Sequence, residues 1–193
     1  MKIRFGLALC AVVLVCALPS SAGAQAPAAI EYRVLATSKT STMQKEMQDA
    51  AAAGFQFGEV MGGDTSFGGS EVVVIMHRSG SADRFDYRLM ATSKTSTMQK
   101  ELQEAGDAGF EYRGQTVFKS TFGGKEVVAI LERSVDAKNA EQYDYRLLAS
   151  KKTSTMQKEL SEAGEQGYEF VGMTVAKTLV GGDEVVTILR RKL

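Results

Sequence analysis

Lys39-Thr-Ser-Thr-Met-Gln-Lys-Glu46 occurs three times in the chain, and the rest of the sequence can be aligned outward from its copies. The other copies run from Lys94 to Glu101 and from Lys152 to Glu159. Extended in both directions, they become three units that align without a gap from a tyrosine to an arginine, and we assign the repeats to 31–78, 87–133 and 145–191. Such self-similarity at a fixed period predicts a tandem array of one small module.

The N-terminus has the pattern of a secretory signal peptide. Lys2 and Arg4 precede an apolar run from Phe5 to Leu18, and Ala22-Gly23-Ala24 forms a cleavage site of the Ala-x-Ala type. We expect cleavage after Ala24, which makes 1–24 the signal peptide and 25–30 a short tether. An uncleaved membrane anchor is the alternative, but the apolar run is shorter than the ~17 to 25 residues of a spanning helix. The expected location is periplasmic or extracellular.

Composition excludes several function classes for the exported chain. Both cysteines, Cys10 and Cys16, lie inside the signal peptide, so the remainder has no disulfide, thiol nucleophile or thiolate metal site. A disulfide-free exported chain depends on a sizeable packed core. The full chain has 23 basic and 23 acidic residues, and cleavage removes two basic ones. That balance does not favour nucleic acid, and no membrane span is expected after cleavage.

Each unit reads as strand, helix, strand, strand. A short strand pattern at 32–37, 87–92 and 145–150 precedes the triplicated stretch. Ser41, Ser96 and Ser154 each have glutamine three residues later, which predicts a capping box at the helix start. Apolar side chains then follow at helical spacing, as in Met43, Met47 and Ala50, and a glycine such as Gly54 suits a left-handed C-terminal cap.

The second half of each unit predicts a β-hairpin. Aromatic residues alternate at the start of the second strand, and paired glycines accept the positive φ of a tight turn. The glycine pairs are Gly68-Gly69, Gly123-Gly124 and Gly181-Gly182, and the third strands are expected at 71–78, 126–133 and 184–191.

The pattern resembles a small bacterial family of unknown function. Tyr32-Arg33-Val34-Leu35, the following helix and Gly167-Tyr168-Glu169-Phe170-Val171 are similar to that family's Tyr-x-Val-Val strand, helix and Gly-Trp-Glu-Leu-Val strand. The resemblance supports the β-α-β-β reading and implies no activity.

The third strands are apolar on both faces. In the first unit Val72 and Met76 point one way, while Val73 and Ile75 point the other. One helix covers only one face of a small sheet, so the second face must be buried by a neighbouring unit or a second chain. The predicted fold is therefore α+β, with three tandem β-α-β-β repeats, each one helix on a three-stranded mostly antiparallel sheet, packed as one body. Homo-oligomers are compatible with it.

The triplicated residues suggest one candidate site. Because the helix crosses back over the sheet, strands one and two run parallel, and the helix start and the Gly-Gly turn share one edge. Helix starts attract anions through free amide groups and the helix dipole. The candidate ligand-binding residues are the lysine, threonine and serine of each copy: Lys39, Thr40, Ser41, Lys94, Thr95, Ser96, Lys152, Thr153 and Ser154. Ordinary capping and surface ion pairs explain the same residues without a ligand and are the favoured explanation.

Enzyme chemistry finds little support in the sequence. The only histidine, His77, is replaced by Glu132 and Arg190 in the other units, and no cluster has the spacing of a metal site or a catalytic triad. We therefore expect a non-enzymatic exported repeat protein, without cofactor or metal, that binds an unknown protein or a small anionic ligand multivalently. A structural or assembly role in the cell envelope is the alternative, and an enzyme without a recognisable site comes last.

Overall fold

The computed structural model describes residues 29–66, 69–80, 83–119, 125–137, 141–177 and 183–193. The predicted signal peptide, most of the tether and five of the six predicted turn glycines lie outside these ranges. Only Gly69 of the glycine pairs is described, at the start of a strand with φ +107°.

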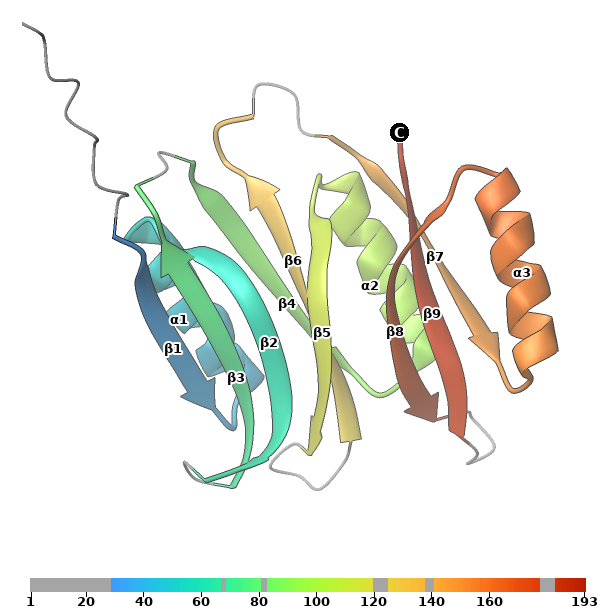
Figure 1. Ribbon diagram of the computed structural model, residues 1–193, viewed down its shortest axis with the longest axis horizontal. Helices are drawn as coiled ribbons and strands as arrows, with labels where there is room; N and C mark the ends of the chain where they lie inside the picture. Colours follow the sequence, from blue (N-terminus) through green and yellow to red (C-terminus); the bar gives the residue numbers. More distant parts are fainter. Residues whose placement is uncertain (1–28, 67–68, 81–82, 120–124, 138–140, 178–182) are drawn as a thin grey trace, which may run out of the picture.

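Three copies of one β-α-β-β unit follow each other along the long axis of the molecule (Figure 1). The first unit consists of β1 (Glu31–Thr37), α1 (Thr40–Ala52), β2 (Gln56–Thr65) and β3 (Gly69–Arg78). The second consists of β4 (Phe85–Thr92), α2 (Thr95–Asp107), β5 (Glu111–Lys119) and β6 (Lys125–Ser134). The third consists of β7 (Tyr143–Ser150), α3 (Thr153–Glu165), β8 (Glu169–Lys177) and β9 (Asp183–Lys192).

Each unit has its own three-stranded sheet with the third strand in the middle, in the orders β1-β3-β2, β4-β6-β5 and β7-β9-β8. Both outer strands are antiparallel to the central one, so they run parallel to each other, as predicted. The helix starts and the hairpin ends therefore share one edge of the molecule, at the bottom of Figure 1. The predicted α+β fold class with tandem repeats is confirmed.

The helices begin and end for local reasons. Met43, Met47 and Ala50 are fully buried on one face of α1, as their spacing predicts. At the C-terminal end Gly54 adopts φ +83°, and the amide of Phe55 donates to the carbonyl of Ala50 at 3.0 Å. This is a Schellman ending, and Gly109 and Gly167 end α2 and α3 in the same conformation.

An aromatic ring held between two arginines fixes each helix end to its sheet. The guanidinium carbons of Arg33 and Arg78 lie 4.3 and 4.8 Å from the centroid of the Phe55 ring. Arg78 also donates to the carbonyl of Ala53 at 2.7 Å and pairs with Glu31 at 2.7 Å. The same arrangement surrounds Phe110 and Tyr168, so every unit has its own internal clamp.

The units stack with one orientation, so the helix side of one sheet meets the opposite side of the next. The first core combines α1 and its sheet face with Tyr87, Val128 and Ile130 from the second unit. The second core combines α2 and its sheet face with Tyr143, Tyr145, Leu147 and Ile188 from the third unit. The prediction that a neighbouring unit buries the second sheet face is thus confirmed for units two and three. In the first unit this face is the free end of the array.

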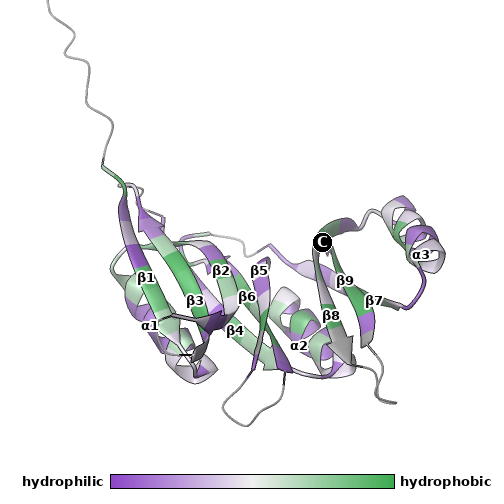
Figure 2. Cartoon of the chain, turned by 60° about the horizontal axis from the view of Figure 1, so that its bottom comes forward, coloured by the Kyte–Doolittle hydropathy of each residue, from purple (hydrophilic) through white to green (hydrophobic). Residues whose placement is uncertain are grey.

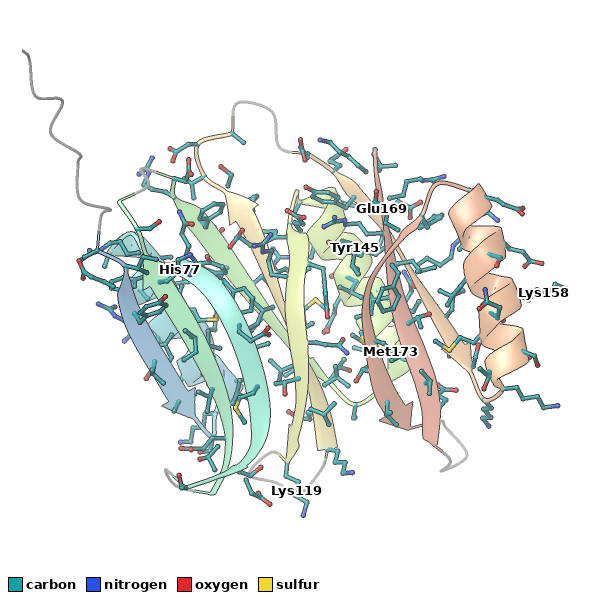
Figure 3. The ribbon with its side chains drawn as sticks, in the orientation of Figure 1. His77, Lys119, Tyr145, Lys158, Glu169 and Met173 are labelled. Atoms are coloured by element: carbon teal, nitrogen blue, oxygen red, sulfur yellow. The ribbon has the colours of Figure 1, made fainter. Side chains whose placement is uncertain are left out.

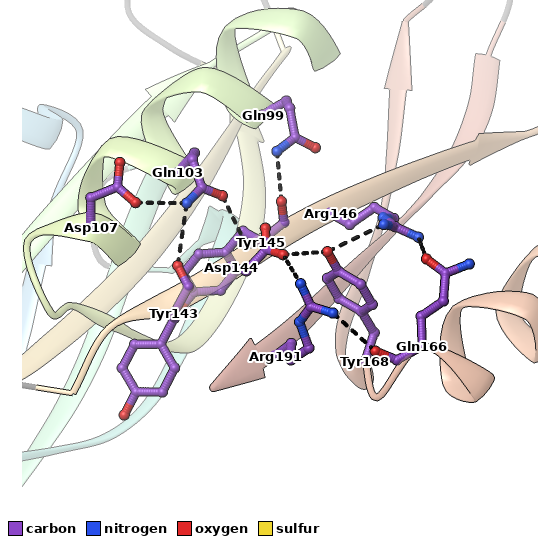
Figure 4. Close-up of polar contacts among 10 residues, drawn as sticks. All are labelled: Gln99, Gln103, Asp107, Tyr143, Asp144, Tyr145, Arg146, Gln166, Tyr168 and Arg191. Carbon is purple, nitrogen blue, oxygen red and sulfur yellow. Dashed lines mark hydrogen bonds and ion pairs between the residues drawn. The ribbon is translucent and has the colours of Figure 1, made fainter. Parts of the chain in front are cut away.

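Glutamines on each helix bind the edge strand of the following unit. Gln44 donates to the carbonyl of Tyr87 and accepts from the amide of Leu89, both at 2.5 Å. In the second joint Gln99 donates to the carbonyl of Tyr145 at 2.8 Å (Figure 4). It also accepts a hydrogen bond from the amide of Leu147 at 2.7 Å. The helix side chains thereby cover main-chain groups that an edge strand would otherwise expose.

The capping-box prediction was wrong. Lys39, Lys94 and Lys152 are the residues before the helices, no side chain caps the starts, and Ser41 lies inside the first turn. In α1 and α2 the glutamine that a capping box would fold back onto its own helix is bound to the next unit instead. A contact between units has therefore replaced a local one.

A tyrosine hydroxyl closes each joint at a β-bulge. The register of β2 shifts between Phe57 and Glu59, and the amide of Phe57 donates to the Tyr87 hydroxyl of the next unit at 2.7 Å. The amide of Tyr112, at the corresponding bulge of β5, donates to the Tyr145 hydroxyl at 2.6 Å. Burial raises the pKa of Tyr145 to about 12, so its hydroxyl keeps its proton and donates in turn to the carbonyl of Phe110.

Candidate functional site

The candidate residues from the triplicated stretch lie at the three helix starts. Lys39, Lys94 and Lys152 are exposed there, and so are Ser41, Ser96 and Ser154. The starts are strung along one edge of the molecule, so the structure does not bring the nine residues together (Figure 1).

Glu184 lies between the second and third helix starts. Thr95 donates to a Glu184 carboxylate oxygen at 3.2 Å, which links α2 to β9 of the next unit. Lys152 and Thr153 line a hollow of about 320 Å³ that also contains Glu184. A carboxylate at this position would repel a second anion, which weakens the case for an anion site there. Anion binding by the helix starts stays a prediction.

A group of ionisable side chains lies at the opposite edge. Tyr87 donates to Glu132 at 2.7 Å, and Arg113 approaches the same carboxylate at 3.6 Å. Burial raises the pKa of Glu132, while the hydrogen bond from Tyr87 opposes the shift. In the second joint Arg190 pairs with Glu111 at 2.5 Å. Glu132 is thus paired within the second unit, whereas the pair of Arg190 and Glu111 joins the third unit to the second.

His77 stands at the position of Glu132 and Arg190 in the first unit (Figure 3). It is half-buried, and in the strand register it lies opposite Tyr32 of β1 and Gln56 of β2. Neither of these two residues is a carboxylate that could orient a catalytic histidine. Within the described ranges, no group of three histidine, cysteine, aspartate or glutamate side chains could hold a metal ion.

A groove with a mainly apolar lining lies between the second and third units. Its volume is about 570 Å³, and its walls come from β5 and β6 on one side and from β8 and β9 on the other. We call it the joint groove. Its lining includes Gln115, Val117, Val127, Met173, Thr174 and Val175. Pockets of this size commonly hold small ligands.

Two buried polar atoms in the joint groove have no partner. The hydroxyl of Thr174 lies on a residue that is only 6% exposed, and the side-chain carbonyl of Gln115 is also buried. The amide nitrogen of Gln115 donates to the carbonyl of Met173, which holds the side chain across the groove. Buried polar atoms normally find hydrogen-bond partners, so an unpaired hydroxyl and carbonyl in one groove are suited to a bound ligand.

Two positions that line the joint groove differ between the first and second units. The first joint has Val60 and Gly62 where the second has Gln115 and Val117, and β5 runs alongside β2 far more extensively than alongside β8. Val60 is only 6% exposed and approaches the backbone of Gly114. The repeat alignment missed this site because it emphasised residues shared by the units. The differences at 60, 62 and their counterparts were the available signal.

The molecule is thus a tandem array of α+β units, and the joint groove lies between the second and third of them. Comparison with protein-family models, with curated proteins and with solved structures finds no match to the chain. The resemblance to the small bacterial family stays a prediction. Each described helix has 13 residues, too few for the ~20 that a bilayer requires.

Proposed function

We propose that the protein is an exported, non-enzymatic binding module and that the joint groove holds its ligand. The signal-peptide pattern of 1–24 supports export. Glu132 accepts a hydrogen bond from Tyr87, and Arg190 pairs with Glu111. Neither side chain is left free as a catalytic acid or base, which supports a binding role.

The unpaired hydroxyl of Thr174 carries the proposal. It lines the same groove as Gln115, whose side-chain carbonyl can only accept a hydrogen bond, while Val117, Val127 and Val175 are apolar members of the lining. The matching ligand is a small, largely apolar molecule with at least one N–H or O–H donor. Lys125 and Glu126 both line the groove, so their opposite charges give no preference for an anion.

Indole is a suitable probe because it combines an apolar ring with one N–H donor. Titration of the isotope-labelled protein is expected to shift the backbone amide resonances of Val117, Thr174 and Val175 more than those of β1 and α1. N-methylindole lacks the donor and should bind about tenfold more weakly, the cost of one unpaired buried acceptor.

Two variants separate groove binding from surface adhesion. Thr174→Val keeps the shape of the side chain and removes the hydroxyl, so indole should bind it several-fold more weakly. Thr155→Val, on the exposed surface of α3, is the matched control and should bind like the unmodified protein. Equal resonance shifts in both variants, or no shift at millimolar indole, would contradict the proposal.

A further inference from the structure

The two ends of the array carry the two halves of the joint that the chain builds twice inside itself. At each internal joint, the helix and helix-side face of one unit receive the first strand of the next unit. The end units have the same surfaces, but each lacks a neighbour on its outer side (Figure 2).

The front half of the joint is exposed on β1. Tyr32 is 69% exposed, whereas its counterparts Tyr87 and Tyr145 are 1% and 2% exposed, and Val34 beside it is 58% exposed. The register of β1 on β3 matches that of β4 on β6, so the carbonyl of Tyr32 and the amide of Val34 correspond to the groups that Gln44 binds in the next unit. Met61 extends the same apolar surface.

The rear half is exposed on α3 and β8. Phe170 is 57% exposed, although its counterparts Phe57 and Tyr112 are 5% and 7% exposed. Gln157 is the counterpart of Gln44 and Gln99, and it is exposed, donating only to Ser161 one turn along its own helix. Of the α3 residues, Ala163 alone is fully buried, because no further unit covers this helix.

One residue at the front end departs from the internal joints. Glu59 stands where Gly114 and Gly172 receive the aromatic side chain of the preceding unit. At Gly172 a Cβ atom would lie 2.4 Å from the Tyr112 hydroxyl, but at Gly114 it would lie 3.2 Å from the Phe57 ring. The aromatic side chain at the rear end is Phe170, without a hydroxyl. A joint between chains therefore resembles the first internal joint, where an aromatic ring without a hydroxyl meets this position. There the Cβ atom of Glu59 fits after a small shift of the Phe170 ring.

We infer that the rear face of one chain, formed by α3 and β8, binds the front face of a second copy, formed by β1. Gln157 binds the carbonyl of Tyr32 and the amide of Val34 there, and the Tyr32 hydroxyl reaches the bulge at Phe170. The two faces differ, so the contact is head to tail and builds chains or rings rather than a two-fold dimer. Two residues make the contact between chains weaker than the internal joints. Glu59 replaces a glycine, and Ser161 is shorter than its counterparts Gln48 and Gln103.

Sedimentation of the exported chain over a range of concentrations tests this inference. The average mass should rise from one chain towards two or more between about 1 µM and 1 mM, the range of a weak reversible contact. Glu59→Gly restores the internal pattern and should tighten association about tenfold, since it removes the one side chain that opposes docking. A single species of one-chain mass throughout this range, for both proteins, overturns the inference.

Mixing two end variants tests the head-to-tail geometry. Val34→Glu blocks the front face and Phe170→Glu blocks the rear face, and both positions are exposed, so the fold of each chain should be unaffected. Each variant alone should stay monomeric, whereas a mixture should form pairs that stop at two chains. Lys158→Glu, on the outer side of α3, is the control and should associate like the unmodified chain (Figure 3). Association of either end variant alone would exclude this contact.

Discussion

The first and second joints are built from the same parts but close to different degrees. Both use a glutamine that binds the next edge strand and a tyrosine that reaches back to a bulge. In the first joint Val60 and Gly62 let β2 lie along β5, while in the second Gln115 and Val117 stand in the way and leave about 570 Å³ open. Repetition therefore supplies the scaffold, and a few divergent side chains decide whether a joint is core or binding site.

Gly106 offers the strongest way to break the second joint. A Cβ atom at this helix position would lie 2.2 Å from the carbonyl of Tyr143. Gly106→Ala should therefore lower the free energy of unfolding by about 3 kcal/mol, the upper range for overpacking. Gly164→Ala is the matched control, because nothing lies within 4 Å there, and it should stabilise the protein by about 1 kcal/mol. Urea denaturation measures both, and equal effects would show that the helix does not dock as described.

The hydroxyls of Tyr87 and Tyr145 differ in the charge of the acceptor that they bind, a carboxylate in the first joint and a main-chain carbonyl in the second. Tyr87→Phe removes the hydrogen bonds that the Tyr87 hydroxyl makes with the amide of Phe57 and with the buried carboxylate of Glu132, which keeps only Arg113 at 3.6 Å, and should cost about 2 to 3 kcal/mol. Tyr145→Phe leaves two neutral main-chain groups unpaired and should cost about 1 to 2 kcal/mol. The same denaturation experiment gives both values, and a reversed order would refute the role assigned to Glu132.

Glu132 makes the first joint sensitive to pH. Burial raises the pKa of Glu132 above the ordinary carboxyl value, so in the corresponding pH window the folded chain holds a proton that the unfolded chain has released. Stability from this group is therefore greatest at low pH and falls as the pH rises from about 4.5 through the folded pKa. Glu132→Gln keeps an acceptor for Tyr87 and should flatten this decline. An unchanged pH profile of stability in Glu132→Gln would contradict the assignment.

Exchanging the divergent residues should move the groove with little change in stability. Gln115→Val combined with Val117→Gly gives the second joint the residues of the first, and should close the groove and abolish indole binding. The free energy of unfolding should change by less than about 1 kcal/mol, as expected for small repacking changes on a partly exposed surface. Undiminished indole binding in this double variant would show that the ligand lies elsewhere.

The sequence predicted what each unit imposes on itself. Helical spacing placed Met43 and Met47 in the core, Gly54 marked the helix end, and the two-sided third strand required a neighbour. The sequence of one unit could not predict which local contacts would be replaced by contacts with the neighbouring unit. Gln44 fits a capping box equally well until β4 is placed beside it. The joint groove was missed because it depends on the spacing between two strands of different units, which no pattern within one unit encodes.

The unequal burial of the helices has a consequence for how the molecule loses its structure. In a linear array, each internal unit is stabilised by two neighbours and each end unit by one. The last unit also has the smallest core, limited to Ala163, Tyr168 and Leu189 as fully buried members. Unravelling should therefore start at α3, and hydrogen exchange would register it as protection that is lowest in α3.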